Sequence, residues 1–114
     1  MEPFYTFHIE LKKLNKKLLN LSTQVEERFR QATSLIANYD EQTAQSLILN
    51  DYQIDEQEVE IEEDCLKILA LHQPVAGDLR FIITVIKVNN ELERIADMGV
   101  NIAIGARAIS KSKS

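Results

Sequence analysis

Two carboxylates interrupt an apolar helical stripe in the last third of the chain. Residues 74–109 carry apolar side chains at alternating steps of four and three on two faces, and on one face Asn90, Glu93 and Asp97 replace them. An ionised carboxylate inside an apolar stripe is costly unless a positive charge lies beside it. We therefore expect a cation, either a basic side chain or a metal ion, next to Glu93 and Asp97.

A second acidic stripe lies upstream. It repeats at steps of four, three and four, which places its members on one side of a helix, and it consists of Asp51, Asp55, Glu58 and Glu62. If a short turn near Pro74 joins two antiparallel helices, Glu93 faces Asp55 and Asp97 faces Asp51. Oxygen ligands suit Mg²⁺, Ca²⁺, Mn²⁺ or iron. The predicted metal ligands are Glu93, Asp97, Asp51 and Asp55, with Asn90, Glu58 and Glu62 as additional ligand or interface candidates.

The same acids can instead belong to a salt-bridge network that binds no metal. Arg80, Lys87 and Arg94 lie one step aside from the acidic face and could neutralise part of it. Without such charges, mutual repulsion would raise the pKa of some of the carboxyl groups. The spacing leaves both interpretations open.

Three long helices are expected to position these acids. Only 3 glycines, 2 prolines and 6% aromatic residues accompany long stretches of helix-forming residues. The apolar rhythm predicts helices over about residues 3–38, 40–72 and 74–109, with a break in the first near Arg28 and Phe29. Asp40 is the predicted N-cap of the second helix, and Pro74 ends it. Short turns then require an all-α, antiparallel, up-down-up three-helix bundle.

The charge pattern limits the function classes. The net charge is -5, which argues against a nucleic-acid binder. Residues 40–73 contain ten acids and one lysine, whereas the first helix carries a lysine cluster formed by Lys12, Lys13, Lys16 and Lys17. Such a cluster can hold anionic lipid, but the antiparallel arrangement also places it opposite the acids of residues 61–66.

Other signals are negative. The lone Cys65 cannot form an internal disulfide, and no signal peptide or membrane-spanning apolar run is visible, so we expect a cytoplasmic protein. There is no P-loop, nucleophile elbow or Glu-x-x-His pair, and we expect no enzymatic activity.

The third helix also resembles a known family. Residues 74–80 read PVAGDLR, residues 92–97 LERIAD and residues 101–103 NIA, and together they are similar to the third-helix signature of the PhoU family. The upstream pattern of Asp51, Asp55, Glu58, Glu62 and Cys65 looks like its second helix. The resemblance implies a single PhoU-like three-helix domain over residues 1–109, followed by a polar tail at 110–114.

The resemblance also implies a function. PhoU-like proteins regulate inorganic phosphate uptake beside the phosphate ABC transporter and a phosphate-sensing histidine kinase, so contact with a membrane is expected only through these partners. The family's E/D-x-x-x-D metal motif, associated with iron or other divalent ions, maps onto Glu93 and Asp97. Typical members contain two such repeats. The resemblance therefore implies that the single repeat forms a homodimer, through the apolar residues of the interrupted face of the third helix: Leu79, Ile83, Ile86, Val100 and Ile104. The alternative is a structural dimerisation or accessory module, for example of a sodium-phosphate cotransporter, that binds no metal.

Overall fold

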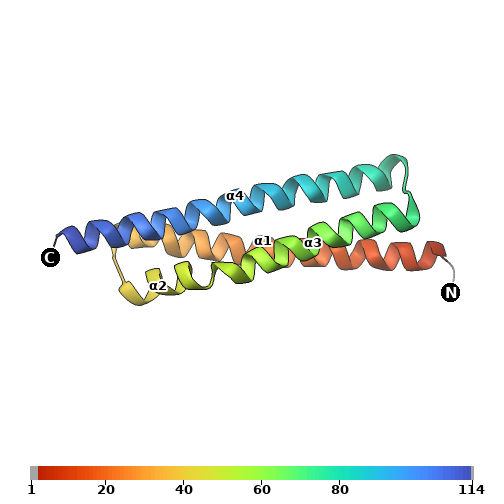
Figure 1. Cartoon of the computed structure of the whole chain (residues 1–114). Helices are drawn as coiled ribbons and strands as arrows, with labels where there is room; N and C mark the ends of the chain where they lie inside the picture. The colour runs from red at the N-terminus through yellow and green to blue at the C-terminus, as the bar shows by residue number, and fades with distance from the viewer. Residues whose placement is uncertain (1–2, 114) are drawn as a thin grey trace.

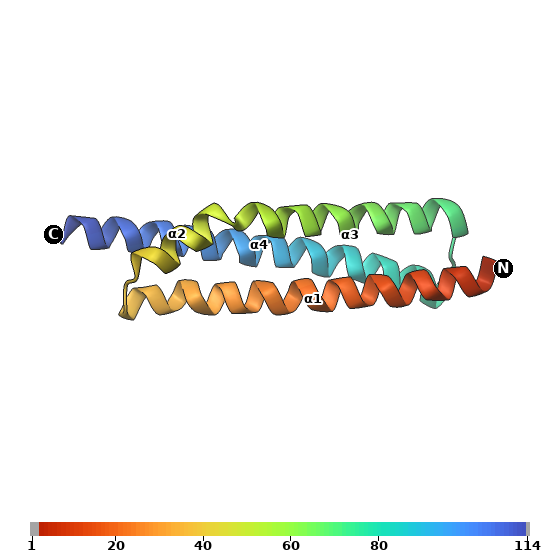
Figure 2. The ribbon, with the colours of Figure 1, turned by 90° about the horizontal axis from the view of Figure 1, so that it is seen from below.

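The computed structural model describes residues 3–113, and all of its regular structure in that range is helical. The elements are α1 (Pro3–Ala37), α2 (Glu41–Leu49), α3 (Asp51–His72) and α4 (Ala76–Ser112). Figures 1 and 2 show α1 and α4 side by side along the molecule, with α2 and α3 following one another along the same length. The rod measures 64 × 22 × 17 Å. The prediction of an all-α chain is confirmed.

The predicted helix over residues 40–72 is divided into two. At its start, Asp40 is the N-cap as expected, and its carboxylate accepts a hydrogen bond of 3.0 Å from the Thr43 N–H. At Asn50 the backbone leaves the helical region, with φ -99° and ψ 6°. The Asn50 side chain donates to the Ser46 hydroxyl. The helix ladder is interrupted here, because the Gln53 N–H bonds to the Asn50 carbonyl, only three residues before it, so the prediction of one continuous helix is wrong.

The turn between α3 and α4 departs from the prediction by two residues. Gln73 takes a left-handed conformation and its N–H bonds to the Leu69 carbonyl at 3.2 Å, so it terminates α3. After Pro74 the chain stays extended through Val75, and α4 begins at Ala76. At the other end α4 continues to Ser112. Residues 110–112 are therefore helical and do not form the predicted tail, whereas Ser114 lies outside the described residues.

The core takes one stripe of side chains from each long helix. The fully buried side chains include Leu14, Leu21, Val25, Ile54 and Ile61, which lie on α1 and α3. On α4 the inward stripe is Ile82, Val85, Asn89, Leu92, Ala96, Gly99 and Ala103.

Large apolar side chains of α4 lie beside this stripe. Phe81 and Ile95 are only partly buried, and Val88 and Ile109 are exposed. The physical reason is close helix approach. A Cβ on Gly99 would lie 3.8 Å from the Phe29 ring, so this crossing takes small residues, and the larger ones flank it.

Candidate functional site

A buried polar layer crosses the interface between α3 and α4. Glu58 of α3 is 5% exposed and Asn89 of α4 is 4% exposed. The Asn89 side-chain amide donates a hydrogen bond of 3.0 Å to the Glu58 backbone carbonyl. Glu58 Oε1 and Asn89 Oδ1 are buried and have no hydrogen-bond partner among the described residues. Buried polar atoms are normally satisfied, so this layer is unusual and calls for a functional explanation.

Four further acids surround Glu58. The pKa of Glu58 is raised to about 8, first by burial and then by the charges of Glu93, Asp55, Asp97 and Asp51, in that order of influence. The structure therefore brings together the four carboxylates that the sequence predicted, two from α3 and two from α4. We call these five residues the acidic cluster.

The members of the acidic cluster differ in exposure. Asp55, Glu93 and Asp97 are exposed, whereas the Asp51 side chain is only 20% exposed. The pKa of Asp51 is raised, first by burial and then by Asp55, against a lowering effect of Arg28. Within residues 3–113, no three His, Cys, Asp or Glu side chains are placed as a preformed metal-binding group. The charges of these carboxylates thus influence one another, but the described side chains are not arranged around one metal position.

Arg28 of α1 is the basic residue that forms an ion pair with the acidic cluster. Its Nη2 lies 4.0 Å from Asp51 Oδ1 and donates to the Leu47 carbonyl at 2.6 Å. Arg28 was not among the site residues predicted from the sequence. Its signal was the break in the apolar rhythm of the first helix, at the position where Arg28 reaches across to the start of α3.

The basic residues of α4 that could neutralise the acidic cluster form no ion pair with it among the described residues. Arg94 pairs with Glu91 at 3.2 Å on the exposed side of the helix. No ion pair in the described part of the chain joins Arg80 or Lys87 to the acidic cluster. The salt-bridge network considered as an alternative is therefore reduced to the single contact between Arg28 and Asp51.

The three residues predicted as additional ligand or interface candidates lie in different surroundings. Glu58 is at the centre of the acidic cluster. Asn90 and Glu62 are exposed, and the charges that raise the pKa of Glu58 come from other acids. The neighbouring Asn89, which was not predicted, occupies the buried position instead. Its signal was its place on the stripe of Ile82, Val85, Leu92 and Ala96.

The predicted interface residues differ in exposure. Leu79, Ile83 and Ile104 are 37%, 40% and 43% exposed, Val100 is half-buried, and Ile86 is half-buried and packs against the core. No helix of residues 3–113 has the length and apolar character that crossing a bilayer requires.

Comparison with known proteins gives one consistent family. The family model described as PhoU domain matches residues 18–104. Similar curated proteins include phosphate-specific transport system accessory protein PhoU homolog 1 of Methanothermobacter thermautotrophicus, which is 36% identical over 107 residues, covering 94% of this chain and 49% of the relative. The PhoU homolog of Aquifex aeolicus is 36% identical over 94 residues, covering 82% and 42%.

The PhoU accessory protein of Escherichia coli is 34% identical over 92 residues, covering 81% of this chain and 38% of the relative. No solved structure matches the chain. The chain thus spans about half the length of these relatives, or less. Because the PhoU model covers most of the chain and the relatives agree with it, the chain belongs to the PhoU family.

Proposed function

We propose that this chain is a non-enzymatic PhoU-type unit that serves a phosphate transport system as an accessory protein in the cytoplasm. The curated relatives are accessory proteins of phosphate-specific transport systems. In this proposal the bundle docks to a phosphate ABC transporter or to its sensor kinase, and the occupancy of the acidic cluster by a cation biases that contact. The similarity to these relatives supports a role in phosphate transport. The docking partner is proposed here.

The observation that carries the cation site is the imbalance of charge in the acidic cluster. Four carboxyl groups act on a fifth, Glu58, and Arg28 lies 4.0 Å from one of the four, Asp51. A divalent cation bound by Glu93 and Asp97 of α4, together with Asp51 and Asp55 of α3, would remove the repulsion and bridge the two helices. Because no three ligands are preformed within residues 3–113, binding would require side-chain rotation, which exposed carboxylates allow at small cost.

The experiment compares a Glu93→Ala, Asp97→Ala variant with Glu91→Ala as the matched control. Glu91 is an exposed acid of the same helix whose partner is Arg94, outside the cluster. Calorimetric titration with Mn²⁺, Mg²⁺ and Ca²⁺, and metal analysis after exposure to iron, should show loss of binding only in the double variant, with helicity retained. Equal metal binding by the wild type and both variants would reject the site and leave a structural module.

We further propose that the outer apolar face of α4 binds a second copy of the chain. The relatives are at least twice as long as the segment matched here, and Leu79, Ile83 and Ile104 are exposed on this single unit. Two identical faces related by a two-fold axis would bury one another. The homodimer would then provide the two bundles that one longer chain provides in the relatives.

A further inference from the structure

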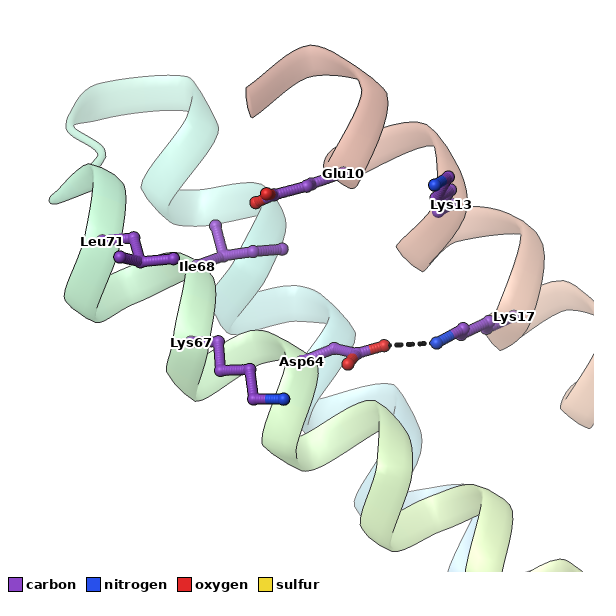
Figure 3. A pocket seen from close by; sticks show the side chains of 7 residues that line it. All are labelled: Glu10, Lys13, Lys17, Asp64, Lys67, Ile68 and Leu71. Carbon is purple, nitrogen blue, oxygen red and sulfur yellow. Dashed lines mark hydrogen bonds and ion pairs between the residues drawn. The ribbon is translucent and has the colours of Figure 1, made fainter. Parts of the chain in front are cut away.

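A pocket of about 230 Å³ opens between α1 and α3, away from the acidic cluster. Figure 3 shows its side chains: Lys13 and Lys17 come from α1, Lys67 comes from α3, and Ile68 and Leu71 form part of the wall. Three lysines thus line one hollow, together with Glu10 and Asp64, in a chain whose net charge is -5. A second hollow, lined by Lys13, Lys17 and the neighbouring Lys16, continues along α1.

The two acids of this pocket already have partners. Asp64 accepts a hydrogen bond of 2.7 Å from Lys17, as the dashed line in Figure 3 shows, and Lys17 also pairs with Glu60 at 2.8 Å. Glu10 lies 3.1 Å from the His72 ring. The whole lysine cluster was expected to lie opposite the acids of residues 61–66, and among the described residues only Lys17 forms an ion pair there.

Two ammonium groups therefore remain available. Lys13 and Lys67 have no ion pair with any described residue, although each lies one helical turn from the pair between Lys17 and Asp64. Both line the pocket with Ile68 and Leu71, from two different helices and, in Figure 3, from different sides of it. Ammonium groups that line one hollow attract a small anion with several acceptor oxygens.

We propose that this pocket binds a tetrahedral oxyanion of the phosphate class, held by Lys13 and Lys67 with Lys17 as a third contact. A water molecule takes up about 30 Å³ of liquid, so a pocket of about 230 Å³ accommodates one phosphate group and several waters. The same chemistry is offered by free inorganic phosphate and by the phosphate of a lipid head group. The site rests on the pocket and its charges, and it is independent of the cation site and of the docking proposal.

The test is an NMR titration of the ¹⁵N-labelled chain with inorganic phosphate at constant ionic strength. Saturable shifts are expected in residues 10–17 and 64–71. Lys13→Gln and Lys67→Gln should each weaken binding about twofold to fivefold, as expected for exposed charge pairs. The matched control is Lys12→Gln, which removes an exposed lysine of the same helix that does not line the pocket and should change the affinity less than about twofold.

A variant with the opposite sign makes the test sharper. Asp64→Asn removes a carboxylate that repels the anion and competes for Lys17. It should tighten phosphate binding, whereas a merely structural role of the pair would give no gain. Circular dichroism of each variant checks that the bundle is intact.

A parallel arm separates the two sources of phosphate. Vesicles of phosphatidylglycerol and of phosphatidylcholine are sedimented with each variant. Binding of free phosphate that depends on Lys13 and Lys67 supports a small-ion site. Binding only to phosphatidylglycerol, with the same dependence, supports a lipid head group. The proposal is overturned if neither ligand binds, if Lys12→Gln weakens binding as much as the pocket variants, or if Asp64→Asn binds more weakly.

Discussion

Replacement of Glu58 by Gln should make the chain more stable at alkaline pH. The Glu58 carboxyl is 5% exposed and its pKa is raised from 4.5 to about 8. Between these two values the unfolded chain releases a proton that the folded chain retains, so the free energy of unfolding falls as pH rises. Below pH 4.5 this loss of stability is absent, and above about pH 8 it is complete. The amide introduced by Glu58→Gln carries no charge, so this pH-dependent loss would disappear.

The magnitude follows from the pKa shift. At about 1.36 kcal/mol per unit, a rise from 4.5 to about 8 corresponds to a ceiling of about 5 kcal/mol. Water near the exposed acids Asp55, Glu93 and Asp97 raises the effective dielectric constant and reduces that value. We expect the variant to gain about 2 to 3 kcal/mol relative to the wild type between about pH 5 and pH 8.5.

Urea unfolding of both proteins in the presence of a chelator, at a series of pH values, measures this difference. The amide also packs differently from the carboxyl group, which changes the free energy of unfolding by an amount that does not depend on pH. The diagnostic quantity is therefore how the difference in free energy of unfolding between variant and wild type, called the offset below, changes with pH. Glu56→Gln, which replaces an exposed acid of the same helix, is the control and should show no such change. If the offset for Glu58→Gln is equal at the two ends of this pH range, or if the variant loses stability at high pH, the electrostatic account of the buried layer is wrong.

Three further predictions concern assembly and stability. Ile83→Glu should dissociate the proposed dimer, because this side chain is 40% exposed on the single unit, while Leu19→Glu on α1 should not; an unchanged sedimentation coefficient for Ile83→Glu would reject the proposed interface. Gly99→Ala should raise the free energy of unfolding by about 0.5 to 1 kcal/mol, since the new methyl group meets Phe29 at an ordinary 3.8 Å; a lower thermal midpoint would contradict this. Asp40→Ala should cost about 1 kcal/mol in urea unfolding, because α2 loses its N-cap bond to Thr43; an unchanged midpoint would show that the cap contributes nothing.

Helix periodicity predicted much of the fold because it is a local property. The apolar steps of four and three located the long helices, and Asp40 and Pro74 marked where one helix begins and another ends. The same periodicity placed Asp51 and Asp55 near Glu93 and Asp97, since antiparallel neighbours joined by a short turn have a nearly fixed register. The prediction of these neighbours required no knowledge of side-chain contacts.

The break at Asn50 and the rotation of α4 were not accessible in this way. A stripe on a helix shows that one side is apolar, but the side that faces inward depends on the other helices. Gly99, Ala96 and Ala103 are buried because α4 approaches α1 closely there, and the larger Ile95 and Ile102 are displaced to the edges. Which side of α4 faces inward depends on how its side chains fit against those of the neighbouring helices, and periodicity alone does not describe that fit.

The sequence by itself determined the helical class, the family signature and the spacing of the acids, because each depends on residues close together in the chain. Only the tertiary structure decided that Glu58 and Asn89 are buried, that Arg28 reaches Asp51, and that Lys13 and Lys67 lie beside a pocket without an ion pair to any described residue. The reason is that burial and charge are sums over neighbours from several helices. A carboxyl group changes its pKa when water is removed by residues far from it in the sequence.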